Sequence, residues 1–167
     1  MADIDEAGNE IMDALFRWSD WASETEPPPE SIAFAAGSKS EGHPRAWIEE
    51  ITNWPALFVH PLAWPTNRRI GKQDEHLFTC EVFVIIAAEA GTQPYRLVRE
   101  AAMKVKRNIV GAFDATGYIL GLSYLADMRW VRLSPENEMA RFYRERNMPF
   151  AAASIALDLV TYSEAED

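Results

Sequence analysis

The chain has 167 residues, of which 26 are acidic and 16 basic, giving a formal net charge of −10. This length suits one domain, and 48% hydrophobic residues without an apolar run near the ~18 of a membrane span favour a soluble protein with no membrane partner. An acidic chain without a dominant basic patch also argues against specific binding of nucleic acid.

Cys80 is the only cysteine, which excludes an internal disulfide and a zinc site built from cysteines. The N-terminal residues lack the basic flank and apolar stretch of a signal peptide, so a reducing, cytoplasmic setting is expected. Charge is unevenly distributed: residues 1–50 hold 12 acidic and 3 basic side chains, whereas residues 89–132 hold 4 acidic and 7 basic. Such asymmetry favours contacts between protein surfaces of opposite charge.

The first element is predicted to be a helix within residues 1–23. Its apolar residues recur at intervals of three, four and seven, the spacing of one helix face, at Ile4, Ile11, Leu15, Trp18 and Ala22. Residues 24–53 contain the Pro27–Pro29 run and no apolar period, so they are predicted to form an extended arm or insertion that orders against a neighbour.

Two strands are predicted next, at 57–59 between Pro55 and Pro61 and at 77–88. In the second strand both alternating sets of side chains are apolar, which predicts a central strand covered on both faces. The intervening residues 64–72 are basic and are predicted to form the loop at the tip of a long hairpin.

A second, amphipathic helix is predicted from Pro94, with Thr92 as its cap and Gly117 at its exit. Its apolar stripe comprises Leu97 or Val98, Ala101, Val105 and Ile109. Glu100 and Lys104 have the i,i+4 spacing of a favourable ion pair.

Two further strands are predicted, at 122–131 and 151–162. Residues 134–148 fit either a short helix, with Ser134 as cap and Pro135 at its first position, or an extended hairpin loop. The predicted fold is therefore one α+β domain, residues 1–167, with a sheet-and-helix core at 54–167. Its mixed, mainly antiparallel sheet of about four strands packs against the N-terminal and central helices.

No constellation predicts catalysis, so we expect no enzyme, no catalytic residue, no metal and no cofactor. His43, His60 and His76 are spaced 17 and 16 residues apart, unlike metal-ligand motifs. Cys80 lies on the apolar face of a strand, where a thiol is a poor nucleophile. Gly117 and Gly121 precede a predicted strand rather than the Lys-Ser/Thr and helix of a phosphate loop. Structural roles are favoured for Asp114, Asp127 and Asp158.

Six tryptophans are many for this length, and tryptophan is enriched at interface hot spots. Trp47, Trp54 and Trp64 lie in or beside irregular segments rich in proline and charge. We therefore expect a neighbouring subunit to bury them.

The order of the strand at 57–59, the strand HLFTCEVFVIIAAE, the helix YRLVREAAMKVKRNIVGAF and the strand PFAAASIALDLVTYS resembles that of the tail terminator, or tail-completion, proteins of long-tailed bacteriophages. The likeness covers residues 54–162 and includes a closing V-x-Y at Val160–Tyr162. It implies a homohexameric ring without a cofactor that ends tail-tube polymerisation and joins the tail to the head. The implied partners are other copies of the chain, the tube protein, neck or connector proteins and, in a contractile tail, the sheath. Such a protein would be assembled in the host cytoplasm and end in the virion at the tail–neck junction.

With this resemblance, Arg96, Arg99 and Arg107 are expected to face an acidic neighbouring subunit. The basic segment with Arg68, Arg69 and Lys72 is expected to touch the tube. The alternatives are another phage neck or tail connector, a small-molecule-binding or enzymatic domain on a ferredoxin-like sheet, and, last, an RNA-binding sheet.

Overall fold

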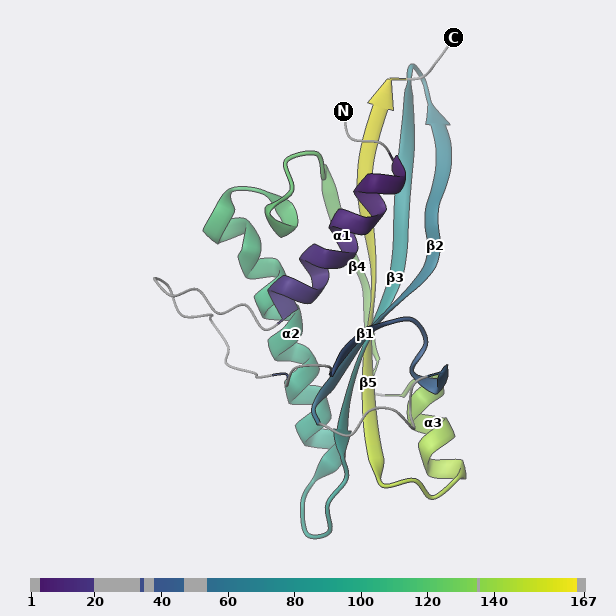
Figure 1. Cartoon of the computed structure of the whole chain (residues 1–167), viewed down its shortest axis with the longest axis vertical. Coiled ribbons are helices and arrows are strands. Elements are labelled where there is room, and N and C mark those ends of the chain that lie inside the picture. Colours follow the sequence, from purple (N-terminus) through teal and green to yellow (C-terminus); the bar gives the residue numbers. More distant parts are fainter. Residues whose placement is uncertain (1–3, 20–33, 35–37, 47–53, 135, 165–167) are drawn as a thin grey trace.

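A mixed five-stranded sheet organises the computed structural model, which describes residues 4–19, 34, 38–46, 54–134 and 136–164 (Figure 1). The strand order is β1-β2-β3-β5-β4; β1 pairs in parallel and all other pairs are antiparallel. The strands are β1 (Lys39–Glu41), β2 (Ala56–Ile70), β3 (Gln73–Ala87), β4 (Asp127–Ser134) and β5 (Phe150–Glu164). The predicted α+β class is confirmed, with β1 as an additional strand inside the segment predicted to be an arm.

Helices cover both faces of this sheet. The α-helices of the described residues are α1 (Ile4–Ser19), α2 (Pro94–Thr116) and α3 (Glu138–Glu145), with short 3-10 turns η1 (Pro44–Ala46) and η2 (Ile119–Gly121). α1 and α2 pack on one face, and α3 lies on the other face near one end of the long strands (Figure 1). Within the described residues, no helix is both long and apolar enough to cross a membrane.

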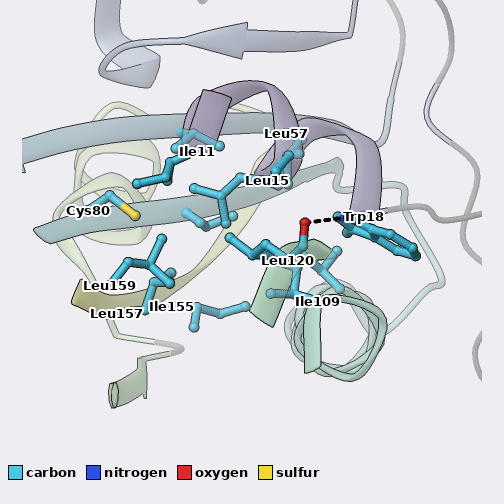
Figure 2. Packing of buried hydrophobic residues seen from close by; sticks show 14 of the residues in the cluster. Ile11, Leu15, Trp18, Leu57, Cys80, Ile109, Leu120, Ile155, Leu157 and Leu159 are labelled. Carbon is cyan, nitrogen blue, oxygen red and sulfur yellow. Dashed lines mark hydrogen bonds between the residues drawn. The ribbon is translucent and has the colours of Figure 1, made fainter. Parts of the chain in front are cut away.

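The main core lies between the sheet and the α1–α2 layer (Figure 2). Ile11 and Leu15 of α1, Ile109 of α2 and Leu157 of β5 are at most 1% exposed there. The Trp18 indole, also buried, donates a hydrogen bond from Nε1 to the Leu120 carbonyl oxygen at 3.0 Å. This bond joins the end of α1 to η2 and satisfies the polar atom of a buried ring.

β3 is the central strand that its two apolar faces predicted. Phe78, Cys80, Val82 and Val84 enter the main core. The alternate residues Phe83 and Ile85 enter a second cluster, in which α3 contributes Met139 and Tyr143 and the sheet also contributes Ala56, Phe58 and Ala152.

The predicted loop at 64–72 is wrong: β2 runs to Ile70, and only Gly71 and Lys72 form the turn to β3. β2 passes Pro61 and Pro65 with two register shifts between Pro61 and Thr66. Among the described residues, β1 pairs only with 57–59 of β2, so both prolines lie on an open edge. A proline costs little at an edge because no ladder hydrogen bond is lost there.

The buried face of α2 matches the predicted apolar stripe at Val98, Val105 and Ile109, but Ala102 rather than Ala101 is fully buried. Gly117 ends the helix as predicted, in the left-handed conformation with φ 79°, and its N–H binds the Phe113 carbonyl oxygen. The prediction that Thr92 caps α2 is wrong. Gln93 occupies the N-cap position without a side-chain bond, and the Thr92 hydroxyl donates instead to the carbonyl of Glu89, one turn back.

Two later boundaries also differ from prediction. Residues 122–126 form a turn, and the strand predicted at 122–131 begins only at Asp127. The ambiguous segment 134–148 contains helix α3, which is capped by Asn137 rather than Ser134. The Asn137 amide oxygen accepts from the Ala140 N–H at 2.9 Å, and its amide nitrogen donates to the carbonyls of Ser134 and Ala152 at 3.1 Å each.

Candidate interaction surfaces

The cysteine and two of the three carboxylates considered for catalysis are engaged in the fold, whereas Asp114 is exposed near the end of α2. Cys80 is fully buried, and this burial raises the pKa of its thiol, so it is a poor nucleophile. Asp127 accepts from Arg129 Nε at 2.9 Å, and Asp158 accepts from the Thr79 hydroxyl at 2.7 Å. Within the described part of the chain, no group of three or more His, Cys, Asp or Glu could hold a metal ion.

One hydrogen-bonded set has the order of a Ser-His-Asn triad. His76 lies 2.6 Å from Asn67 Oδ1 through Nδ1 and 2.6 Å from Ser163 Oγ through Nε2. Ser163 lies in the paired register of β5 with β3, opposite Asp74, and Asn67 lies opposite His76 on β2. The set therefore serves as a polar link across β2, β3 and β5.

The outer face of α2 gathers most of the exposed apolar surface. Eight large hydrophobic residues are exposed in the described part of the chain: Leu62 and Ile70 lie on β2, five lie on α2, and Tyr118 lies just beyond the end of α2. The six outside β2 occur between residues 95 and 118. They are Tyr95, Leu97, Met103, Val110, Phe113 and Tyr118.

A regular stripe runs along this outer face. Its residues are spaced three and four apart, as on a helix that packs against another helix: Arg96, Arg99, Met103, Lys106, Val110 and Phe113. The stripe is basic toward the start of α2 and apolar toward its end. We call these six residues the α2 stripe.

The middle of the α2 stripe borders a groove of about 460 Å³ between α2 and the end of β4. Met103, Val110 and Leu133 supply apolar walls, while Lys106, Arg107 and Asp114 also line the groove. Because β4 is an edge strand of the sheet, the groove lies at the side of the molecule rather than in its centre.

The three arginines predicted to face a neighbour lie on this side of α2. Arg96 and Arg99 belong to the α2 stripe and are exposed, and Arg107 lines the groove. Arg96 Nε pairs with Glu100 at 3.0 Å, in place of the predicted pair between Glu100 and Lys104. Both Arg96 and Lys104 are four residues from Glu100. The planar Arg96 guanidinium can form two hydrogen bonds to a carboxylate, so it competes well with the Lys104 ammonium for Glu100.

The predicted basic tip is partly neutralised across the strands. Arg68 pairs with Glu75 at 3.2 Å and Arg69 with Asp74 at 3.8 Å, because the β2–β3 register places each acid opposite its arginine. Lys72 lies in the turn itself.

Trp54 and Trp64 find contacts within their own chain. The Trp54 ring centroid is 4.5 Å from that of Phe150, and the Trp64 centroid is 5.1 Å from that of Phe78. Trp64 also contacts α1 so closely that a Cβ added to Gly8 would lie 2.5 Å from the indole nitrogen. Both rings are half-buried without a neighbouring subunit. Trp47 lies outside the described residues.

Sequence reasoning named the arginines of this surface but missed its apolar members Met103, Val110, Phe113 and Leu133. The three-and-four spacing of the α2 stripe was the available signal. This spacing was not recognised because the buried stripe of α2 repeats at the same interval.

No protein-family model matches this sequence, and no curated protein matches it. The likeness to tail terminators thus rests on the order and rhythm of the elements.

Proposed function

We propose that this chain is a structural protein that assembles with copies of itself into a ring, as a bacteriophage tail terminator does. In this role the ring caps the tail tube, stops its polymerisation and joins the tail to the neck. The proposal is carried by the exposed apolar and basic stripe on α2, a surface that a lone subunit would leave in water.

The charge distribution supports a head-to-tail contact between unlike surfaces. α1 carries four acidic side chains and one basic, whereas α2 carries five basic and two acidic. A contact between unlike patches on identical subunits repeats around an axis, and it gives a closed ring when the rotation closes. A patch that meets only itself gives a dimer instead.

The hairpin of β2 and β3 supports a second contact, with the tube. Its turn projects beyond both helical layers (Figure 1) and presents Lys72 with the exposed Ile70. Arg68 and Arg69 lie on the adjoining end of β2. In this role the chain acts without a catalytic residue, a cofactor or a metal, and its place is the tail–neck junction of the virion.

Native mass spectrometry of the purified chain tests self-assembly, with a six-subunit particle as the expected result. Electron microscopy of phage lacking this protein then tests the role, because unchecked tube growth is expected to give overlong, headless tails. Tails of normal length that fail to join heads would instead indicate a neck connector. A stable monomer at micromolar concentration, with normal phage yield in its absence, would overturn the proposal.

A further inference from the structure

We propose that the α2 stripe of one subunit packs against the acidic outer face of α1 in the next subunit. This inference rests on the proposed ring assembly and names its contact surfaces. The partner is a second copy of the chain, and the contact is a helix–helix interface with opposite charges at one end and apolar side chains at the other.

α1 offers a suitable surface. Glu6, Asn9, Asp13 and Arg17 are exposed and spaced three, four and four apart, so they form one stripe facing away from the core. Among the described residues, neither Glu6 nor Asp13 makes an ion pair. Phe16, half-buried near the C-terminal end of the same helix, adds an apolar side chain.

Arg99 is the best-placed cation on α2. It is exposed, and within the described part of the chain it makes no ion pair, whereas Arg96 is held by Glu100. Packing α2 against a second α2 would bring together two helices with an excess of basic side chains. Packing it against α1 joins opposite charges, which favours the unlike pair over either like pair.

The positions of the two helices permit a repeating contact. α1 packs against β2, which has only three-residue β1 beyond it in the described part of the sheet. α2 packs against β5, and its groove reaches Leu133 in the edge strand β4. The two helices therefore lie toward opposite edges of the sheet, and the stripe on α1 faces outward from the helical layer. Subunits placed side by side bring α2 of one next to α1 of the following one.

The apolar part of the contact is the groove beside β4. Met103, Val110 and Leu133 line it, and Val110 is 43% exposed in the subunit. A side chain such as Phe16 would fill part of it and remove apolar surface from water on both sides.

The experiment is a charge swap on the full chain. Arg99→Glu alone, and Glu6→Arg combined with Asp13→Arg, are each expected to weaken assembly at least about tenfold, since each places like charges together. The triple variant, with all three changes in one chain, is expected to recover the wild-type particle. Mass photometry across a dilution series gives the assembled fraction. Circular dichroism checks that each variant is folded.

Mixing the two defective variants gives a sharper result. Between copies of the Arg99→Glu variant, an acidic site on α2 meets the acidic α1, and between copies of the Glu6→Arg, Asp13→Arg variant, the basic α2 meets a basic α1. Between the two variants, the acidic site on α2 meets the basic α1, and the basic α2 meets the acidic α1. Both kinds of mixed contact are therefore attractive, and the mixture is expected to recover rings in which the two variants alternate. Native mass spectrometry resolves their equal numbers by mass. Arg141→Glu, on the exposed face of α3, is the matched control and is expected to leave assembly unchanged.

Normal rings from the Arg99→Glu variant, or folded variants in which neither the triple change nor mixing restores assembly, would overturn the assigned surfaces. They would leave the proposed function standing, with another surface making the ring. Normal rings from the Arg99→Glu variant are also the result expected if the chain's own acidic segment 20–33, or a different protein, occupies the α2 stripe. A wild-type chain that is monomeric would instead overturn the proposed function itself.

Discussion

The two ends of the long sheet use the same strands but are held together by different interactions. We call residues 56–61, 80–87 and 150–157 the base half, and residues 66–70, 73–77 and 160–164 the tip half. In the base half, β3 is covered by apolar clusters on both faces. In the tip half, Glu75 is 5% exposed and accepts from Arg68 and Tyr162, and His76 joins Asn67 to Ser163.

Strands that pair in the same way can be stabilised by different side-chain interactions. Register runs unbroken from Gln73 to Ala87 between β3 and β5, so the pairing of these two strands does not distinguish the halves. What differs is the burial of side chains. The base half should therefore respond most to lost volume, and the tip half to lost charge and to salt.

The largest effect is expected from Leu157→Ala in the base half. Leu157 is fully buried in the main core, so truncation should lower the free energy of unfolding by about 3 kcal/mol, the loss typical of a buried leucine. Urea denaturation measures it. Leu62→Ala, on a leucine 53% exposed in β2, is the matched control and should change stability little. Equal losses at both positions would contradict the assignment of the core.

Asn137→Ala tests how α3 is held on the base half. The change removes the cap of the helix and leaves the buried Ala152 carbonyl and the partly buried Ser134 carbonyl without their donor, so a loss of about 2 kcal/mol is expected. Hydrogen exchange should quicken in α3 before it does in β3. Arg141→Ala, at an exposed site on α3 itself, provides the control.

In the tip half, Glu75→Gln should cost about 1 kcal/mol at low salt, because the nearly buried carboxylate loses its ion pairs with Arg68 and Arg129 while its size is kept. The difference from wild type should shrink at high NaCl concentration. Glu164→Gln, an exposed carboxylate at the end of the same half, is the comparison variant. A salt-independent loss would show that packing, rather than charge, holds the tip.

The smallest effect concerns His60, on the β2 edge of the base half, where its ring lies 5.2 Å from that of His43. Burial and then the His43 charge lower the pKa of His60 below 6.5, against weaker opposing effects of Glu81 and Glu138. The folded state thus favours the neutral ring. This contribution is present above pH 6.5 and is lost as the pH falls through the lower folded-state pKa.

His60→Gln should therefore flatten the decline of the melting temperature as the pH falls below about 6.5. The effect should be slight, because the ring is close to solvent. An unchanged pH profile would show that His60 does not contribute to acid sensitivity.

Local patterns in the sequence predicted much of the fold. The apolar spacing of α1 and α2, the two apolar faces of β3 and the glycine at the end of α2 all depend on neighbours within a few residues, and the structure confirms them. The errors in the strands fell on β1, the far end of β2 and the start of β4. Each of these is defined by pairing with a distant strand, and proline at Pro61 and Pro65 wrongly suggested that β2 had ended.

The sequence by itself therefore determined that α1 and α2 are helices and that β3 and β5 are strands, because helical and extended periods are encoded by adjacent side chains. Only the tertiary structure decided that Glu75 meets Tyr162, that His76 meets Ser163, and that the second face of α2 is left exposed. Those outcomes depend on strand register and on the number of layers over the sheet. Both are set by contacts between residues far apart in the chain, for which many chemically equivalent partners compete.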